Sequence, residues 1–220
     1  MEMTRRQLLH AAPFLLTAAK GQAKKPTTGH GEHTYEMTHD YLQLPEKLKF
    51  GNTHGIVVDS QGRIIVAHTV HKTSESSDAI AIFDPSGKFI KSWGADMRGG
   101  AHGLVIRKEG AQEVLYICDN VKGFVRKTTL DGEVIWALHA PVMSGLYPKA
   151  SEYKPSTLAV APNGDFFVAD GYGNHRVIVF DAETGKYKRH WGAYGKRPED
   201  VDLGPYKPND PPPQQFRNPV

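Results

Sequence analysis

Cysteine is almost absent from this sequence: Cys118 is the single one, which excludes an internal disulfide and any CxxC metal knuckle. A large excess of one charge is lacking too, because 27 Lys and Arg are nearly balanced by 24 Asp and Glu. Several of the basic residues lie near the N-terminus. The basic pI is therefore no argument for nucleic-acid binding. Beyond the N-terminus, no long segment has helical periodicity, which disfavours an α/β fold. Cys118 is expected to be an inert core thiol.

A long hydrophobic run is also missing. The apolar stretch from Leu8 to Ala19 is too short to span a bilayer and is interrupted by Pro13. It follows a twin-arginine pattern, Thr4-Arg5-Arg6-Gln7, and precedes a small-residue cleavage site that ends at Ala23. We therefore predict a twin-arginine-type signal peptide at residues 1–23 and an exported protein, periplasmic or extracellular. A frayed amphipathic helix is the alternative.

Residues 24–44 are polar and rich in Gly, Thr and His, which is typical of a linker. His30-Gly31-Glu32-His33 within this segment superficially resembles a metal-binding cluster. It does not fit the helical HExxH spacing, so the sequence gives no reason to assign a metal there. The folded domain is expected to occupy residues 45–220.

Three later segments share one order of strands and turns, beginning at residues 54, 102 and 156. The expected strands are 54–59, 63–68, 79–84 and 88–93 in the first, 102–106, 114–119, 123–128 and 133–138 in the second, and 156–160, 165–170, 176–181 and 186–191 in the third. Four short strands per unit, with turns of the same chemistry each time, are typical of β-propeller blades. We predict an all-β propeller with blades at about 54–95, 102–140 and 156–195 and the start of another at 215. A β-sandwich is the alternative.

Equivalent positions of the three units carry similar residues. Trp93, Trp136 and Trp191 lie on equivalent outer strands and are expected to be packing residues. Asp119 and Asp170 end equivalent second strands, where we expect their carboxylates to accept hydrogen bonds from turn amides.

The third unit resembles an NHL repeat. Residues 158–170 follow the pattern of an apolar strand, a Gly turn and a Val-Ala-Asp ending, and Asn174–Asp181 and Trp191-Gly192 continue it. The likeness is close again at 55–94 and degraded at 103–138. Because many spaced positions match together, the resemblance implies an NHL-type propeller.

His54-Gly55 and His102-Gly103 begin equivalent strands of the first two units, and Ser156 has that position in the third. The innermost strands of propeller blades line a central channel, where ligands bind. Imidazoles from neighbouring inner strands can share a divalent metal such as zinc. The alternative is that each His only forms hydrogen bonds at the channel rim.

Four stretches resemble, in order and spacing, the peptidylglycine α-hydroxyglycolate lyases, which are six-bladed NHL propellers. They are His102-Gly103-Leu104, Pro155-Ser156, Asp170–Arg176 and Gln215–Val220. The resemblance implies that His102 is a zinc ligand, that the backbone carbonyls of Ile56 and Leu104 bind calcium, and that Tyr172 acts on the substrate hydroxyl. The implied reaction breaks a C–N bond to give an amide and glyoxylate, from a peptide or small-molecule ligand in the channel.

Several polar residues are candidates for substrate binding. Asn174 and Arg176 share the turn of Tyr172, and His68 and His71 are placed in the loop after the second strand of the first unit, within reach of the channel mouth. For the two His the alternative is a solvated loop.

The sequence departs from the lyase pattern at Thr69, where the family has an Arg next to the position of His68. A bidentate cation for the substrate carboxylate is then missing. This favours the alternative function, a non-catalytic envelope propeller that binds a peptide, protein or glycan. Two further zinc ligands would follow Val220, so we expect this chain to be inactive as it stands. Since three blades cannot close a propeller, we expect a truncated six-bladed protein or closure by a second copy.

Overall fold

The computed structural model describes residues 25–140, 145–199, 203–205, 207–217 and 219. The chain divides into two units, residues 1–41 and 42–220, which are described separately. The first unit contains a hairpin of β1 (Thr27–His30) and β2 (His33–Glu36), so the segment predicted as a linker has regular structure. The predicted signal peptide lies outside the described residues. No helix among those described is long and apolar enough to cross a membrane.

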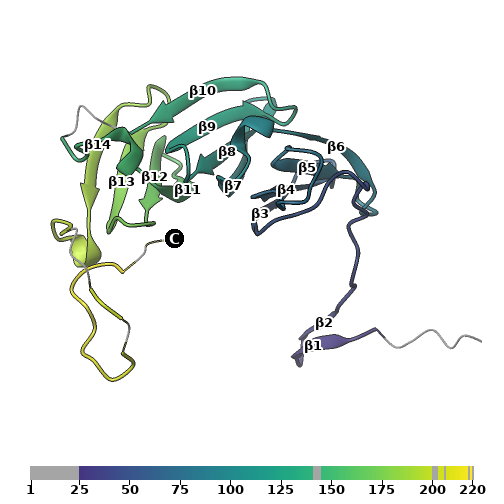
Figure 1. Cartoon of the computed structure of the whole chain (residues 1–220), viewed down its shortest axis with the longest axis horizontal. Coiled ribbons are helices and arrows are strands. Elements are labelled where there is room, and N and C mark those ends of the chain that lie inside the picture. The colour runs from purple at the N-terminus through teal and green to yellow at the C-terminus, as the bar shows by residue number, and fades with distance from the viewer. Residues whose placement is uncertain (1–24, 141–144, 200–202, 206, 218, 220) are drawn as a thin grey trace, which may run out of the picture. The chain divides into compact units, whose positions relative to one another are not determined.

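The second unit is built from three four-stranded antiparallel sheets, in which each strand pairs with the next along the chain (Figure 1). Blade 1 contains β3 (Thr53–Val58), β4 (Ile64–His68), β5 (Ile80–Phe83) and β6 (Phe89–Trp93). Blade 2 contains β7 (Ala101–Glu109), β8 (Gln112–Asp119), β9 (Phe124–Thr129) and β10 (Val134–His139). Blade 3 contains β11 (Pro155–Val160), β12 (Asp165–Asp170), β13 (Arg176–Asp181) and β14 (Tyr187–Trp191).

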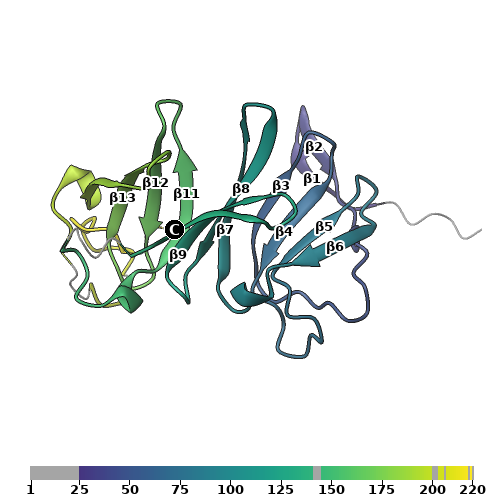
Figure 2. The same cartoon turned by 90° about the horizontal axis from the view of Figure 1, so that it is seen from above.

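The inner strands β3, β7 and β11 lie next to one another, and the outer strands β6, β10 and β14 lie on the far side of each blade (Figures 1 and 2). This arrangement confirms the predicted propeller, because a β-sandwich would merge these strands into two facing sheets. The described blades leave the propeller open. Ile56 and Val58 of β3 are accordingly 62% and 56% exposed.

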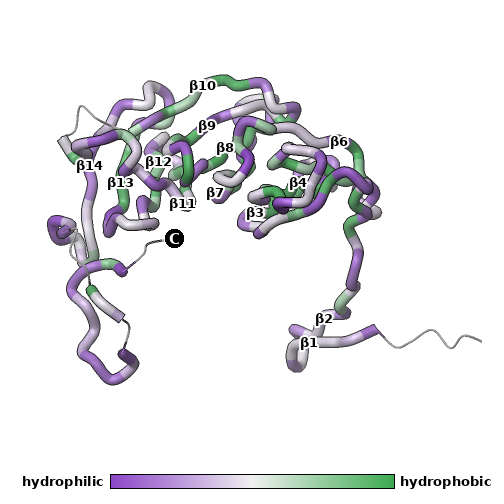
Figure 3. Tube along the Cα trace, in the orientation of Figure 1, coloured by the Kyte–Doolittle hydropathy of each residue, from purple (hydrophilic) through white to green (hydrophobic). Residues whose placement is uncertain are grey.

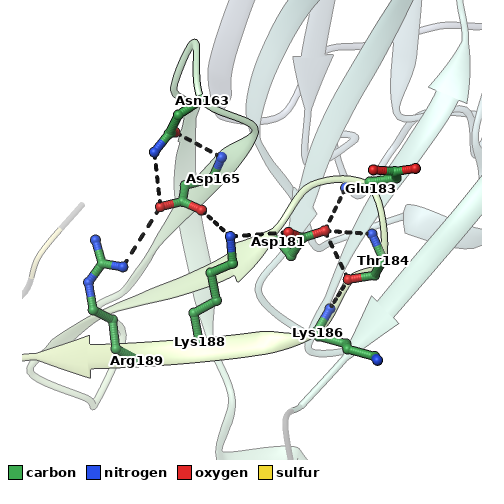
Figure 4. Close-up of polar contacts among 8 residues, drawn as sticks. All are labelled: Asn163, Asp165, Asp181, Glu183, Thr184, Lys186, Lys188 and Arg189. Carbon is green, nitrogen blue, oxygen red and sulfur yellow. Dashed lines mark hydrogen bonds and ion pairs between the residues drawn. The ribbon is translucent and has the colours of Figure 1, made fainter.

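The turns explain why each sheet forms where the sequence predicts it. Asp84 directly follows β5, the third strand of blade 1, and its carboxylate accepts hydrogen bonds from the amides of Ser86 and Lys88 at 2.8 and 3.0 Å. Gly87 then takes a positive φ of 84°, which glycine adopts without steric cost. Asp181 of blade 3 accepts amide hydrogen bonds from Glu183 and Thr184 in the same way (Figure 4).

Two apolar clusters join the blades, and Figure 3 shows the hydrophobic residues concentrated along their strands. One cluster, which includes Ile65, Ile82 and Leu115, packs blade 1 against blade 2. The other contains Tyr116, Cys118 and Phe166 and packs blade 2 against blade 3. Cys118 is fully buried, and burial raises the pKa of its thiol.

The three Trp residues are packing residues, as predicted. Trp93 contacts the cluster between blades 1 and 2, and Trp136 contacts Tyr116 and Phe166, each with ring centroids 5.8 Å apart. Trp191 packs edge-to-face on Phe167 of β12.

Candidate functional site

The two His-Gly pairs lie where the inner strands begin, and close packing of these strands explains both glycines. A Cβ atom on Gly55 would lie 2.5 Å from Cβ of Leu104. A Cβ atom on Gly103 would lie 2.7 Å from the carbonyl oxygen of Ser156. Each glycine therefore lets its strand approach the inner strand of the next blade. The repeated glycine is needed for packing, whatever the role of the His before it.

His102 is 9% exposed, and both nitrogens of its ring have partners. Nδ1 lies 2.7 Å from the carbonyl oxygen of Ser156. Because a carbonyl can only accept, Nδ1 carries the proton and Nε2 keeps a lone pair. The hydroxyl of Tyr172, 2.8 Å away, donates to this lone pair. Burial lowers the pKa of His102, which favours the neutral imidazole that this pairing needs.

Tyr172 lies in the turn between β12 and β13 and is 45% exposed. Its ring meets that of His102 edge-to-face, with centroids 5.2 Å apart. The structure therefore brings together His102 of blade 2 and Tyr172 of blade 3, both named from the sequence. A half-exposed hydroxyl held by a buried imidazole can exchange a proton with a ligand in the channel.

A buried polar cluster holds this turn. The carboxylate of Asp170 accepts hydrogen bonds from the backbone amide of Lys154 and the side-chain amide of Asn174, both at 2.8 Å, and from the Tyr147 hydroxyl. Asn174 also donates to the carbonyl of Glu152 at 2.6 Å. Asp170 is fully buried, and burial raises the pKa of its carboxyl group. The cluster ties the turn to the segment that precedes β11.

Arg176 belongs to the same cluster. Its Nε lies 3.9 Å from the Asp170 carboxylate, and its guanidinium lies over the Tyr147 ring at 5.2 Å. Asn174 and Arg176 are only 8% and 3% exposed. In this structure they support the turn that carries Tyr172, and substrate contact by either remains a prediction.

His54 stacks on His102, with ring centroids 3.9 Å apart and planes inclined by 19°. Partial burial and the neighbouring His102 both lower the pKa of His54. The lone pair of an imidazole nitrogen lies in the ring plane, so two nearly parallel rings do not point at one ion. The stacked arrangement does not make His54 and His102 joint ligands of one metal.

The residues predicted for calcium lie on neighbouring strands. Ile56 of β3 and Leu104 of β7 each follow their His by two residues, and the strands meet at Gly55 and Leu104. In the described part of the chain, no three His, Cys, Asp or Glu side chains cluster as a metal site would need. On the inner strands, the described residues thus offer zinc one oriented imidazole, His102, and do not complete a zinc site.

His68 ends the second strand of blade 1, as the expected strand 63–68 predicts, but it does not lie in a loop at the channel mouth. It is fully buried, and its ring contacts Phe50 with centroids 4.4 Å apart. Its Nδ1 accepts a hydrogen bond from the amide of Val70 at 3.0 Å. Burial lowers the pKa of His68 to about 4, against a smaller opposing effect of Asp78. The predicted loop position is wrong because Phe50, from the segment before blade 1, covers the end of the strand.

The residues beside His68 also have defined contacts. The Thr69 hydroxyl accepts a hydrogen bond from the amide of Asn52 at 3.0 Å, so Thr69 fixes the approach to β3. His71 is exposed and its Nδ1 lies 2.9 Å from the Thr73 hydroxyl. In blade 2, Asp119 accepts hydrogen bonds from the amides of Val121 and Lys122, as predicted for this position.

Sequence reasoning missed the part played by Ser156. Its carbonyl fixes the tautomer of His102, and its hydroxyl lies 3.0 Å from the carbonyl of Pro219. A carbonyl contact between blades depends on how the strands meet and has no residue signature. Gly171 also approaches Pro219 closely, so Pro219, in the segment predicted to start another blade, lies beside Ser156 of β11 and the turn after β12.

Comparison with known proteins agrees with this architecture. Residues 153–180 match the NHL repeat family model. A probable peptidyl-α-hydroxyglycine α-amidating lyase of Caenorhabditis elegans, pgal-1, is 27% identical over 198 residues, covering 78% of this chain and 55% of that protein. Peptidyl-α-hydroxyglycine α-amidating lyase 2 of Drosophila melanogaster is 30% identical over 167 residues, covering 66% of this chain and 39% of that protein. The chain thus spans about half or less of these relatives.

Solved structures with similar folds are more distant. Virginiamycin B lyase of Staphylococcus aureus, in an inactive form with quinupristin, is 16% identical with a TM-score of 0.48, covering 71% of this chain and 45% of that one. Apo AztD of Citrobacter koseri is 18% identical with a TM-score of 0.46, covering 80% of this chain and 44% of that one. At these values neither neighbour bears on function. The predicted likeness is confirmed: the chain is a β-propeller chain with an NHL repeat at residues 153–180, and it resembles the amidating lyases.

Proposed function

We propose that this chain provides part of the active site of an exported lyase that cleaves a peptidyl-α-hydroxyglycine into a peptide amide and glyoxylate. The observation that carries the proposal is the hydrogen bond between the Tyr172 hydroxyl and His102 Nε2, at 2.8 Å across two blades. Similarity to the curated lyases supports the choice of substrate. The twin-arginine pattern of the sequence supports export.

The Tyr172–His102 pair is suited to moving one proton. As the phenolic proton passes to Nε2, the phenol oxygen takes the proton of the substrate hydroxyl. The carbon then forms a carbonyl while its bond to nitrogen breaks, and the leaving amide nitrogen takes a proton back from the pair. The substrate loses a proton at oxygen and gains one at nitrogen, so the reaction needs no net acid or base.

Zinc and calcium are part of the proposal. Zinc at His102 would polarise an oxygen of the substrate as a Lewis acid. Because His102 Nε2 has one lone pair, zinc bound there would prevent this nitrogen from accepting the Tyr172 proton, and the transfer described above would belong to the zinc-free pair. With zinc present, Tyr172 would instead take the substrate proton as a phenolate. The further zinc ligands would come from groups other than the described residues. The carbonyls of Ile56 and Leu104 would serve calcium, which prefers oxygen ligands.

Release of glyoxylate from α-hydroxyhippurate, an N-acyl-α-hydroxyglycine, tests the proposal with the full chain, with and without added zinc. We expect Tyr172→Phe to lower kcat by about 10²- to 10⁴-fold, because it removes the proton-transferring hydroxyl. Tyr194→Phe is the matched control, since Tyr194 is 70% exposed and outside the pair. A measurable rate of glyoxylate release that is equal for Tyr172→Phe and the unmodified chain would contradict the role of Tyr172.

A second function is favoured by Thr69, whose hydroxyl is bound to the backbone at Asn52 and provides no cation for a substrate carboxylate. The propeller would then bind a peptide, protein or glycan without turnover. Binding of α-hydroxyhippurate that is unchanged in Tyr172→Phe, with no glyoxylate released under either zinc condition, would support this function over the lyase.

A further inference from the structure

The β1–β2 hairpin places two histidines directly opposite each other. Thr27 pairs with Glu36, Thr28 with Tyr35, Gly29 with Thr34 and His30 with His33. Gly31 and Glu32 form the two-residue turn between the paired histidines. The spacing fits no helical metal motif, but in a hairpin it creates a directly opposed cross-strand pair.

Directly opposed residues of an antiparallel pair project from the same face, with Cβ atoms about 4.5–5.5 Å apart. Imidazoles on such a pair can converge on one ion. The stacked rings of His54 and His102, by contrast, do not converge. The backbone pairing of His30 and His33 therefore permits a convergence that the stacked rings of the inner strands do not.

The backbone beside the pair is fixed by glycine. Gly29 has φ of 99°, and a Cβ atom there would lie 1.9 Å from the carbonyl oxygen of His33. Gly31 in the turn has φ of 58°. The Thr34 hydroxyl donates to the Gly31 carbonyl at 2.9 Å, and Lys25 pairs with Glu36 at 2.6 Å at the open end. These contacts hold the register that opposes the two imidazoles.

Both histidines are available to a ligand. Every residue of β1 and β2 is exposed. Within the described residues, neither imidazole forms a hydrogen bond or an ion pair. An exposed imidazole pair is a ligand set for borderline divalent metals and has little affinity for Ca²⁺ or Mg²⁺.

We propose that His30 and His33 form a binding site for a divalent transition metal of the Zn²⁺, Ni²⁺ and Cu²⁺ class, with water at the remaining positions. The site is separate from His102 and does not rest on the lyase proposal. An isolated two-stranded hairpin is marginally stable. A metal that bridges its strands therefore stabilises the hairpin as well as binding to it.

Calorimetric titration of the full chain with ZnCl₂ tests the site. It is done in a His102→Ala background, which removes the imidazole proposed for the channel metal. We expect this chain to bind one zinc ion, and His30→Ala or His33→Ala to weaken that binding at least about tenfold, since each removes one of two ligands. His39→Ala is the control, because His39 is an exposed histidine of the same unit outside the hairpin.

Loss of zinc binding in the His102→Ala background would overturn the proposal, as would an effect of His39→Ala equal to that of His30→Ala. A second variant tests the geometry without removing a ligand. Gly29→Ala should weaken zinc binding, because the added Cβ would collide with the His33 carbonyl and disturb the register. Unchanged affinity in Gly29→Ala would show that the two histidines bind independently of the hairpin, against the proposal.

Discussion

Blades 1 and 3 have the same four-stranded topology but differ at the ends of their second strands. Blade 1 buries a neutral imidazole there, His68, and the next residue, Thr69, binds the backbone. Blade 3 buries a carboxylate, Asp170, whose partners hold a turn that presents Tyr172 toward His102. The position thus accepts either a neutral imidazole or a carboxylate, and in blade 3 the carboxylate holds the turn that carries Tyr172.

The largest loss of stability is expected from removing the buried carboxylate of Asp170 in blade 3. Asp170→Ala leaves the Lys154 amide without its acceptor, removes one of the two acceptors of Asn174, and removes the carboxylate beside the Arg176 guanidinium. Loss of one partner from a buried charged pair costs about 3–5 kcal/mol of unfolding free energy. Urea denaturation measures this loss.

Asp181→Ala is the control for Asp170→Ala, because this carboxylate also accepts turn amides but lies at the surface. The loss of unfolding free energy in Asp181→Ala should be much smaller than in Asp170→Ala. Equal losses for the two variants would mean that burial does not distinguish the blade 3 cluster from an ordinary turn.

An effect of intermediate size on stability is expected from the buried imidazole of His68 in blade 1, and it depends on pH. The pKa of His68 falls from 6.5 to about 4 on folding, so the unfolded chain binds more protons between these values. Stability should therefore decrease as the pH falls from 6.5 to 4, and this group contributes roughly 3 kcal/mol to the decrease. His68→Gln removes this contribution, which urea denaturation at several pH values detects.

The exposed neighbour His71 provides the matched control, and His71→Gln should leave the pH dependence unchanged. Identical curves for His68→Gln and the unmodified chain would show that His68 does not remain neutral in the folded state.

The smallest effect concerns His54, the blade 1 residue that stacks on His102. His54→Ala removes the ring contact and should cost about 0.5–1.5 kcal/mol, whereas His54→Phe keeps an aromatic ring and should retain most of this energy. The urea denaturation midpoints of His54→Ala and His54→Phe measure this difference in stability. If His54→Phe loses as much as His54→Ala, the stacked ring contributes nothing specific to stability.

The sequence predicted the strands well because their limits depend on local chemistry. β12 and β13 have the predicted bounds, since Asp and Gly residues define the turns around them. The His102–Tyr172 pair was also predictable as two members of one site. The burial of His68 was not, because Phe50 belongs to a segment that precedes the repeat.

Two further features lay beyond sequence reasoning. The register of β3 and β4 shifts between Thr53 and Gly55, and His54 lies at this irregularity, so strand alternation does not predict where its ring points. The hairpin at residues 27–36 is polar throughout and lacks the apolar alternation by which strands are recognised.

Cys118 is the single thiol of the chain and lies in the apolar cluster between blades 2 and 3. Burial excludes reagents from it and raises its pKa, and the thiolate is the reactive form. A thiol reagent can therefore modify the protein only while that cluster is open. The rate of modification therefore reports how often the cluster between blades 2 and 3 opens, and the measurement needs no added label.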